Sequence, residues 1–134
     1  MIFLDTDFFI NLYIETNENH ERAKEVYNLI ENKAKIISNL VIMEVITVLN
    51  VRLKKDYDFL LKVHDELNNN YDVINDTTFH AKGFKILLKE FKRNNERIPL
   101  FDSVYMVLMN ELGIKEIASF DKHFDNKEGI VRVH

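Results

Sequence analysis

Two carboxylates stand where an apolar run at the start of the chain ends. In "IFLDTDFF", Asp5 and Asp7 follow three large apolar residues, and the chain then becomes apolar again. The same order returns in "EIASFDKHFD", where Asp121 and Asp125 follow a second short apolar run. Asp5 taken alone is equally typical of a turn or a helix cap, and Asp7 is expected to cap the helix that follows it. If both apolar runs are strands of one parallel sheet, Asp5 and Asp121 lie at its carboxyl edge, where ligands bind.

Two more acids lie in apolar, helical stretches. Glu44 interrupts "NLVIMEVITVLNV", and apolar residues surround it on its helical face. An ionised carboxylate there needs a partner, which can be a basic side chain or a bound cation. Asp102 begins "DSVYMVLMNEL", where helix capping is the alternative role, and Ser119 precedes Asp121 in what can also be a polar turn. Together these oxygen ligands are of the kind that hold Mg²⁺ or Mn²⁺.

Composition limits the classes of protein and site. The 134 residues contain no cysteine, which excludes disulfides and thiolate zinc sites and favours a reducing compartment. Any metal must therefore be bound by oxygen or imidazole. The 18 basic and 22 acidic side chains give a net charge of −4, which argues against broad electrostatic binding of nucleic acid but allows a local basic groove.

The chain length predicts one domain over residues 1–134. The first residues lack a basic start and a small-residue cleavage site, so they do not resemble a signal peptide. The longest apolar stretch is interrupted by Glu44 and is too short to span a bilayer. We therefore expect a cytoplasmic protein with no membrane association.

The pattern of apolar residues predicts alternating short strands and helices. Only three glycines and one proline occur, so a hairpin-rich fold is not expected. Strands are expected at residues 2–5, 34–38, 71–75, 115–120 and 129–133. Helices are expected at 19–32, from Asn39 as an N-cap, at 57–70, at 77–94 with Asp76 as its cap, and at 102–112 before Gly113. Strands separated by helices pair in parallel, so we predict an α/β fold: a three-layer α/β/α sandwich with a short, mostly parallel central sheet.

With these acids in this order, the sequence resembles the PIN domain nucleases, a family that includes the VapC toxins of toxin–antitoxin pairs and several RNA-processing endonucleases. The stretches "IFLDTDFFINLY", "SNLVIMEVITVL", "IPLFDSVYMVL" and "IASFDKHFD" resemble the four family motifs in their usual order and cover essentially the whole chain. Two departures stand out. Asp7 occupies a position where the family often has Asn or Ser, and Tyr105 and Met106 stand where small residues are common. We expect the first to affect metal occupancy and the second to affect packing.

The resemblance implies a metal-dependent endoribonuclease that cleaves single-stranded or structured RNA with metal-activated water. It implies that Asp5, Glu44, Asp102 and Asp121 hold one or two Mg²⁺ or Mn²⁺ ions, and that Ser119 orients a water, a ligand or a phosphate. The products would carry a 5′-phosphate and a 3′-hydroxyl. A stand-alone domain of this size fits a toxin, with a small antitoxin protein as partner and a homodimer as a further expectation.

One helix carries a candidate phosphate track. Its basic residues share one arc, opposite Phe84 and Phe91, and are Lys82, Lys85, Lys89, Lys92 and Arg93. A solvated helix face is the alternative interpretation. Weaker basic candidates are Arg52, Lys54, Lys55 and Arg97. The five histidines show no zinc spacing and are expected to be structural or exposed.

Three other functions remain open. "DTDFF" has the Asp-x-Asp of haloacid-dehalogenase-like phosphatases, but Phe8 follows where those enzymes usually have Gly, and the chain is short for that fold. A PIN-like binding module without catalysis is a second alternative, which the presence of all four acids disfavours. An RNA-processing role for a PIN nuclease is the third.

Overall fold

A five-stranded parallel sheet forms the centre of the computed structural model, which describes residues 1–53 and 56–134. Its strands are β1 (Ile2–Leu4), β2 (Lys35–Ser38), β3 (Asp72–Ile74), β4 (Glu116–Ala118) and β5 (Val131–Val133), in the order β3-β2-β1-β4-β5. All four neighbouring pairs are parallel; Phe3, for example, lies opposite Ile36 on one side and Ile117 on the other. The order of strands reverses at β1. Lys54 and Lys55, two of the weaker basic candidates, lie outside the described residues.

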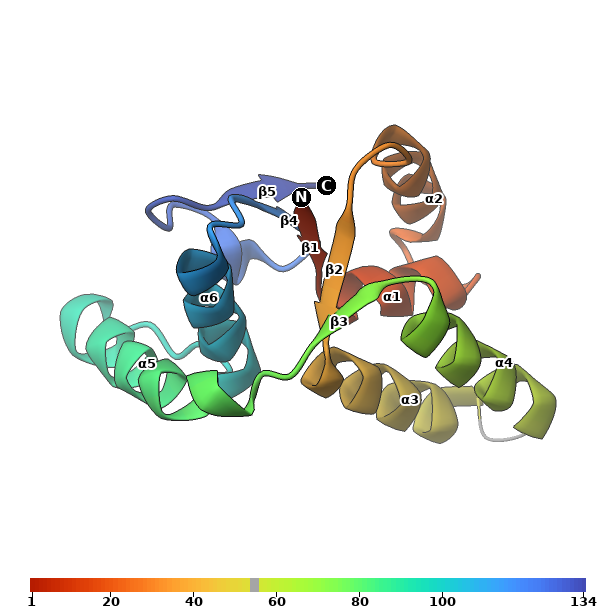
Figure 1. Cartoon of the computed structure of the whole chain (residues 1–134), viewed down its shortest axis with the longest axis horizontal. Helices are drawn as coiled ribbons and strands as arrows, with labels where there is room; N and C mark the ends of the chain where they lie inside the picture. Colours follow the sequence, from red (N-terminus) through yellow and green to blue (C-terminus); the bar gives the residue numbers. More distant parts are fainter. Residues whose placement is uncertain (54–55) are drawn as a thin grey trace.

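Helices cover both faces of this sheet (Figure 1). One face carries α1 (Thr6–Tyr13), α2 (His20–Leu29), α3 (Asn39–Leu53) and α4 (Tyr57–Asn69). The other carries α5 (His80–Asn94) and α6 (Leu100–Leu112), and short 3₁₀ turns occur at η1 (Thr77–Phe79) and η2 (Lys122–Phe124). The crossovers from β1 to β2 and from β2 to β3 run in one direction across the sheet, and the crossover from β3 to β4 runs in the other, so right-handed connections place their helices on opposite faces. The predicted α/β/α sandwich is confirmed.

The central strand is buried on both sides. Ile2, Phe3 and Leu4 of β1 are all fully buried, as expected for a parallel sheet covered by helices on both faces. Phe3 packs against Tyr105 of α6, with 5.1 Å between the ring centroids. This rigid strand ends directly at Asp5, so the core fixes the position of the first acid. Among the described residues, no helix is both long enough and apolar enough to cross a bilayer.

Helix capping differs from the prediction at Asp7, Asp76 and Asn39. Asp5, not Asp7, caps α1, because its Oδ1 accepts a hydrogen bond of 2.9 Å from the backbone N–H of Phe8. Asp76 makes no side-chain cap to the turn that follows it. Its carboxylate instead accepts from the N–H of Leu40 in α3, while the Asn39 side chain accepts from the N–H of Asp76. The caps predicted for Asp7 and Asp76 are therefore wrong, and Asn39, the first residue of α3, uses its side chain to hold β3 beside that helix.

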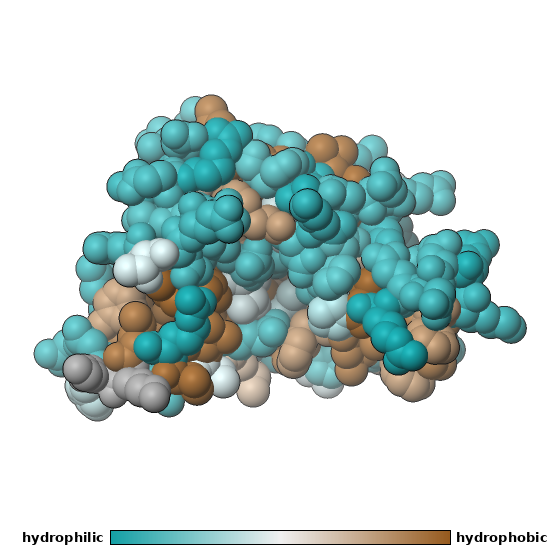
Figure 2. Space-filling view, turned by 180° about the vertical axis from the view of Figure 1, so that it is seen from behind, coloured by the Kyte–Doolittle hydropathy of each residue, from teal (hydrophilic) through white to brown (hydrophobic). Residues whose placement is uncertain are grey.

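Helix α5 leaves most of its apolar side in solvent. Phe84, Leu88 and Phe91 are each at least 40% exposed, and Gly83 is the buried residue of this helix. A Cβ at Gly83 would lie 2.7 Å from a methyl group of Val104, so the glycine allows α5 to approach α6 closely. Figure 2 shows hydrophobic areas low on this face, toward the α3–α4 side and the α5 side. Exposed apolar residues of these elements include Met43, Val51, Tyr57, Leu61, Phe84, Leu88 and Phe91.

Candidate functional site

The carboxyl ends of β1 and β4 bring the first and last motifs together. These strands are neighbours at the point where the strand order reverses, which is where open α/β sheets bind ligands. The hydroxyl of Ser119 donates a hydrogen bond of 2.6 Å to Oδ2 of Asp5, and it accepts one of 2.9 Å from the N–H of Asp121. Ser119 is fully buried and Asp5 is 2% exposed. The serine thus links the two acids and fixes their positions.

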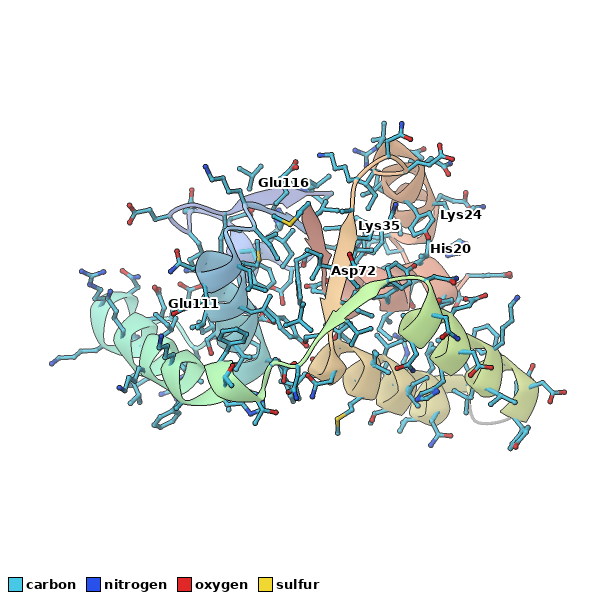
Figure 3. The ribbon with its side chains drawn as sticks, viewed as in Figure 1. His20, Lys24, Lys35, Asp72, Glu111 and Glu116 are labelled. Carbon is cyan, nitrogen blue, oxygen red and sulfur yellow. The ribbon has the colours of Figure 1, made fainter. Side chains whose placement is uncertain are left out.

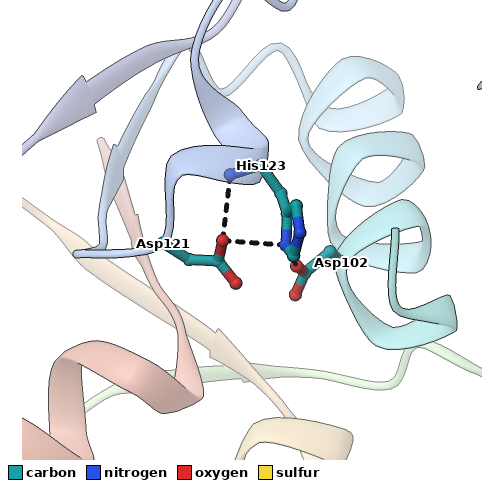
Figure 4. A group of neighbouring side chains, drawn as sticks. All are labelled: Asp102, Asp121 and His123. Atoms are coloured by element: carbon teal, nitrogen blue, oxygen red, sulfur yellow. Dashed lines mark hydrogen bonds and ion pairs between the residues drawn. The ribbon is translucent and has the colours of Figure 1, made fainter. Parts of the chain in front are cut away.

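Asp102 and Asp121 meet on the α6 side of this edge (Figure 4). Helix α6 begins at Leu100 after Pro99, so Asp102 lies in the first turn and is not the helix cap. Asp102, Asp121 and His123 each offer a ligand atom, and the three atoms lie within 4.8 Å of one another. The histidine was not predicted as a site residue. Its signal in the sequence is its position two residues after Asp121, in the η2 turn that folds back on that acid.

Glu44 of α3 is held by two hydroxyl groups. Its Oε1 accepts hydrogen bonds of 2.6 Å from Tyr105 and 3.0 Å from Thr6. Within residues 1–53 and 56–134, no group donates a hydrogen bond to Oε2, so this oxygen can bind a cation. Tyr105 was expected to concern packing, but it also positions this acid. The partner expected for Glu44 was a basic side chain or a cation; among the described residues its partners are two hydroxyl groups and no basic side chain.

Three of the four acids, Asp5, Glu44 and Asp102, have raised pKa values. Burial raises the pKa of Asp5 well above its ordinary value, and it also raises the pKa of Glu44, against the hydrogen bonds from Tyr105 and Thr6. Burial and the nearby charge of Asp121 raise the pKa of Asp102 to about 8, and the charge of Glu44 adds to this. The four acids therefore share one electrostatic environment. A divalent cation would offset both effects by stabilising the ionised carboxylates, and the carboxylate oxygens fit such an ion.

The remaining acids near the site have other contacts. Asp7 accepts a hydrogen bond of 3.1 Å from the N–H of Phe120, and burial raises its pKa. Asp125 turns away to Arg132, which donates bonds of 2.7 and 2.9 Å to its two oxygens. Asp125 is therefore part of an ion pair that supports the turn after β4. Asp7 lies close enough to Asp121 for the charge of Asp121 to raise its pKa.

Most of the predicted basic track lines a cleft that does not include the acidic cluster. Lys82, Lys85, Lys89 and Arg93 line a cleft of about 810 Å³ between α5, the C-terminal half of α6 and residues 126–130. Lys92 and the four acids are not among its lining residues. Some of its charges are paired: Lys82 donates a bond of 2.6 Å to Glu111, which lies between α6 and α5 in Figure 3. The basic cleft and the acidic cluster are thus separate features that share α6.

The raised pKa of Asp102 predicts that the metal-free protein loses stability as the pH rises. Between its ordinary pKa of 3.8 and about 8, the folded state binds this proton and the unfolded state does not. The free energy of unfolding should therefore fall across this range, by about 1 to 3 kcal/mol. Urea unfolding in chelator at pH 5 and pH 8 measures this fall. A flat profile, or one that rises with pH, would contradict the shared charge environment.

Comparisons with known proteins concern the fold and the family of the chain. The family model described as "PIN domain" matches residues 2–130. Mycobacterium tuberculosis VapC20, described as a sarcin-ricin loop cleaving toxin, is similar in structure with a TM-score of 0.82 at 21% identity, over 99% of this chain and 98% of that one. The DNA-bound VapBC of Salmonella typhimurium gives a TM-score of 0.70 at 18% identity, over 98% and 96% of the two chains.

A third structure, Rickettsia felis VapBC2 bound to a DNA fragment from its promoter, gives a TM-score of 0.73 at 13% identity, over 99% and 98% of the two chains. No curated protein matches the chain. The TM-scores show a shared fold, and at these low identities they show the fold alone. Because the family model spans nearly the whole sequence, and all four acid-bearing motifs fall within it, the chain belongs to the PIN domain family.

Proposed function

We propose that this protein is a metal-dependent endoribonuclease that cleaves single-stranded RNA. The observation that carries the proposal is the gathering of Asp5, Asp102 and Asp121 at the strand-order reversal, with the pKa of Asp102 raised to about 8. Acids that repel one another in a metal-free fold are typical of a functional site. Membership of the PIN family favours this activity over the phosphatase alternative.

In the proposed site, Asp5, Glu44, Asp102 and Asp121 would hold one or two Mg²⁺ or Mn²⁺ ions. A divalent ion in such a site lowers the pKa of bound water and stabilises charge on phosphoryl oxygens. The chain's own residues set the positions of the ligands. Ser119 fixes one oxygen of Asp5, and Tyr105 with Thr6 fixes one oxygen of Glu44. Pre-orientation of this kind lowers the cost of gathering like charges around the ion.

We also propose that the protein is the toxin of a toxin–antitoxin pair in the cytoplasm. The similarity to VapC20 and to VapBC complexes supports this role, as does the match of residues 2–130, which fits a single domain over 1–134. The exposed apolar residues of α3, α4 and α5 are suited to cover by an antitoxin or by a second copy of the chain. An RNA-processing nuclease is the second candidate, and co-purification with a small antitoxin would separate the two.

RNA cleavage in the presence and absence of metal tests the proposed activity. The substrates are an unstructured RNA and a sarcin–ricin hairpin, the latter chosen because VapC20 is described as cleaving that loop. We expect cleavage with Mn²⁺ or Mg²⁺ and its loss in excess chelator. Metal-supported cleavage of the hairpin but not the unstructured RNA would correct the substrate class alone. Absence of cleavage of both RNAs, with metal present, would favour a non-catalytic module.

We propose that the basic cleft binds RNA phosphates through Lys82, Lys85, Lys89 and Arg93, and that Lys92 of the same helix contributes to this binding. Lys85 and Lys89 line the cleft, so replacing both with Glu should lower RNA affinity and flatten its dependence on salt, because fewer counterions are released. Fluorescence anisotropy over a salt series with a catalytically inactive variant measures both effects. Lys24→Glu with Lys62→Glu is the matched control on other helices. If the salt dependence of RNA affinity is unchanged in the cleft variant, these lysines form a solvated helix face and do not bind phosphates.

A further inference from the structure

His123 lies between two of the acids at the site (Figure 4). Its Nδ1 is 2.8 Å from Oδ1 of Asp121 and 3.1 Å from Oδ2 of Asp102. The ring is held there by the η2 turn, in which the N–H of His123 donates a bond of 2.9 Å to the same Oδ1 of Asp121. The next residue, Phe124, is fully buried and anchors the turn in the core. The imidazole is therefore placed at the acids by the backbone.

We propose that His123 is a nitrogen ligand of the bound metal ion, and that the site consequently prefers a first-row transition-metal ion such as Mn²⁺ to Mg²⁺. This inference rests on the proposed metal-dependent function. Two ligands that are each about 2.1 Å from an octahedral ion and adjacent to each other lie about 3 Å apart. The separations of 2.8 and 3.1 Å from Nδ1 to the two carboxylate oxygens match this spacing.

The ligand type sets the preference among metals. Mg²⁺ takes oxygen ligands almost exclusively, whereas imidazole binds first-row transition metals well. Asp102 and Asp121 would serve either class of ion, so the nitrogen of His123 decides the difference. The imidazole is also accessible, because 36% of its side-chain surface is exposed while the Asp102 side chain is 11% exposed.

A simpler role for His123 is that of an internal counter-ion for the two acids. The two roles predict opposite results when the histidine is removed. A ligand contributes to metal binding, so its loss weakens binding. A counter-ion competes with the metal for the same oxygens, so its loss leaves the affinity unchanged or increases it.

Metal titration of the full chain with His123→Gln separates the two roles. We expect the variant to bind Mn²⁺ about 10- to 100-fold more weakly than wild type by calorimetry, with a clearly smaller loss for Mg²⁺. His64→Gln is the matched control, because His64 is exposed on α4 and contacts Asn68. Pulsed electron paramagnetic resonance of Mn²⁺ in wild type should show coupling to an imidazole ¹⁴N, and histidine labelled with ¹⁵N should change that signal.

Mn²⁺ that binds wild type without a histidine nitrogen signal would overturn this inference, and so would equal or tighter Mn²⁺ binding by His123→Gln. Either result leaves the four-acid site intact. If wild type binds neither ion, the proposed function fails together with the inference. If His123→Gln does not fold, the nitrogen signal of wild type alone decides the question.

Discussion

Asp102→Asn should lower the rate of RNA cleavage by about 100- to 1000-fold or more, while the metal-free protein remains as stable as wild type or gains about 0.5 to 2 kcal/mol. The side chain keeps its size, so the first turn of α6 should not change. The amide cannot carry the negative charge that a metal ligand needs. It also removes the repulsion with Asp121 that raises the pKa of Asp102 to about 8.

The same change should remove most of the stabilisation by metal. Ligand binding to the native state adds stability by mass action, so Mn²⁺ should raise the melting temperature of wild type more than that of Asp102→Asn. Thermal melts of both proteins in chelator and in excess Mn²⁺ test this. A variant that melts well below wild type in chelator, with the same response to metal, would show that Asp102 is mainly structural. That result would contradict the proposal that the four acids bind metal together.

Asp5→Asn and Asp121→Asn should each weaken metal binding by at least about 10- to 100-fold. Asp5 lies at the end of the buried strand β1 with one oxygen bound to Ser119, and Asp121 lies across the serine from it. Removing either charge leaves the ion with fewer anionic ligands. Calorimetric titration with Mn²⁺ measures the change.

Asp125→Asn is the matched control for these two variants. Asp125 is an acid of the same motif, but both oxygens of its carboxylate accept hydrogen bonds from Arg132, and it does not belong to the group of Asp102, Asp121 and His123. Its replacement should leave Mn²⁺ affinity within a few-fold of wild type. Equal losses in all three variants would indicate a general charge effect, and unchanged affinity in Asp5→Asn and Asp121→Asn would remove the proposed site.

The sequence predicts the sheet and the place of the acids well because both follow from burial. Short continuous apolar runs such as Ile2–Leu4 are typical of strands covered on both faces, and helices between them favour parallel pairing. Once the strands are parallel, Asp5 and Asp121 must lie at the same edge. That step of the prediction requires no side-chain detail.

Contacts between distant segments are what the sequence does not predict. Asp76 caps α3 rather than its own turn, and Tyr105 reaches Glu44 from another helix, because both depend on how helices pack in three dimensions. His123 was missed for a different reason. A search for zinc spacing looks for several histidines, whereas this histidine joins two acids, one of which is 21 residues away.

The apolar face of α5 illustrates a further limit. Its spacing correctly indicates a helix with Phe84, Leu88 and Phe91 on one side, but periodicity cannot say what covers that side. In the structure the close contact to α6 is made through Gly83, and the aromatic residues remain in solvent. The composition of the face therefore predicts the helix but not its partner.

The chemical ends of the cleaved RNA test the central claim most directly. Attack by water in the proposed four-acid site would give a 5′-phosphate and a 3′-hydroxyl, whereas attack by the RNA's own 2′-hydroxyl would give a 2′,3′-cyclic phosphate and a 5′-hydroxyl. The ends are read by ligation and mass spectrometry after cleavage with Mn²⁺, beside reactions in chelator and with Asp102→Asn. We predict 5′-phosphate and 3′-hydroxyl ends that depend on both metal and Asp102. Cyclic phosphate ends, or cleavage that persists in chelator, would contradict the account.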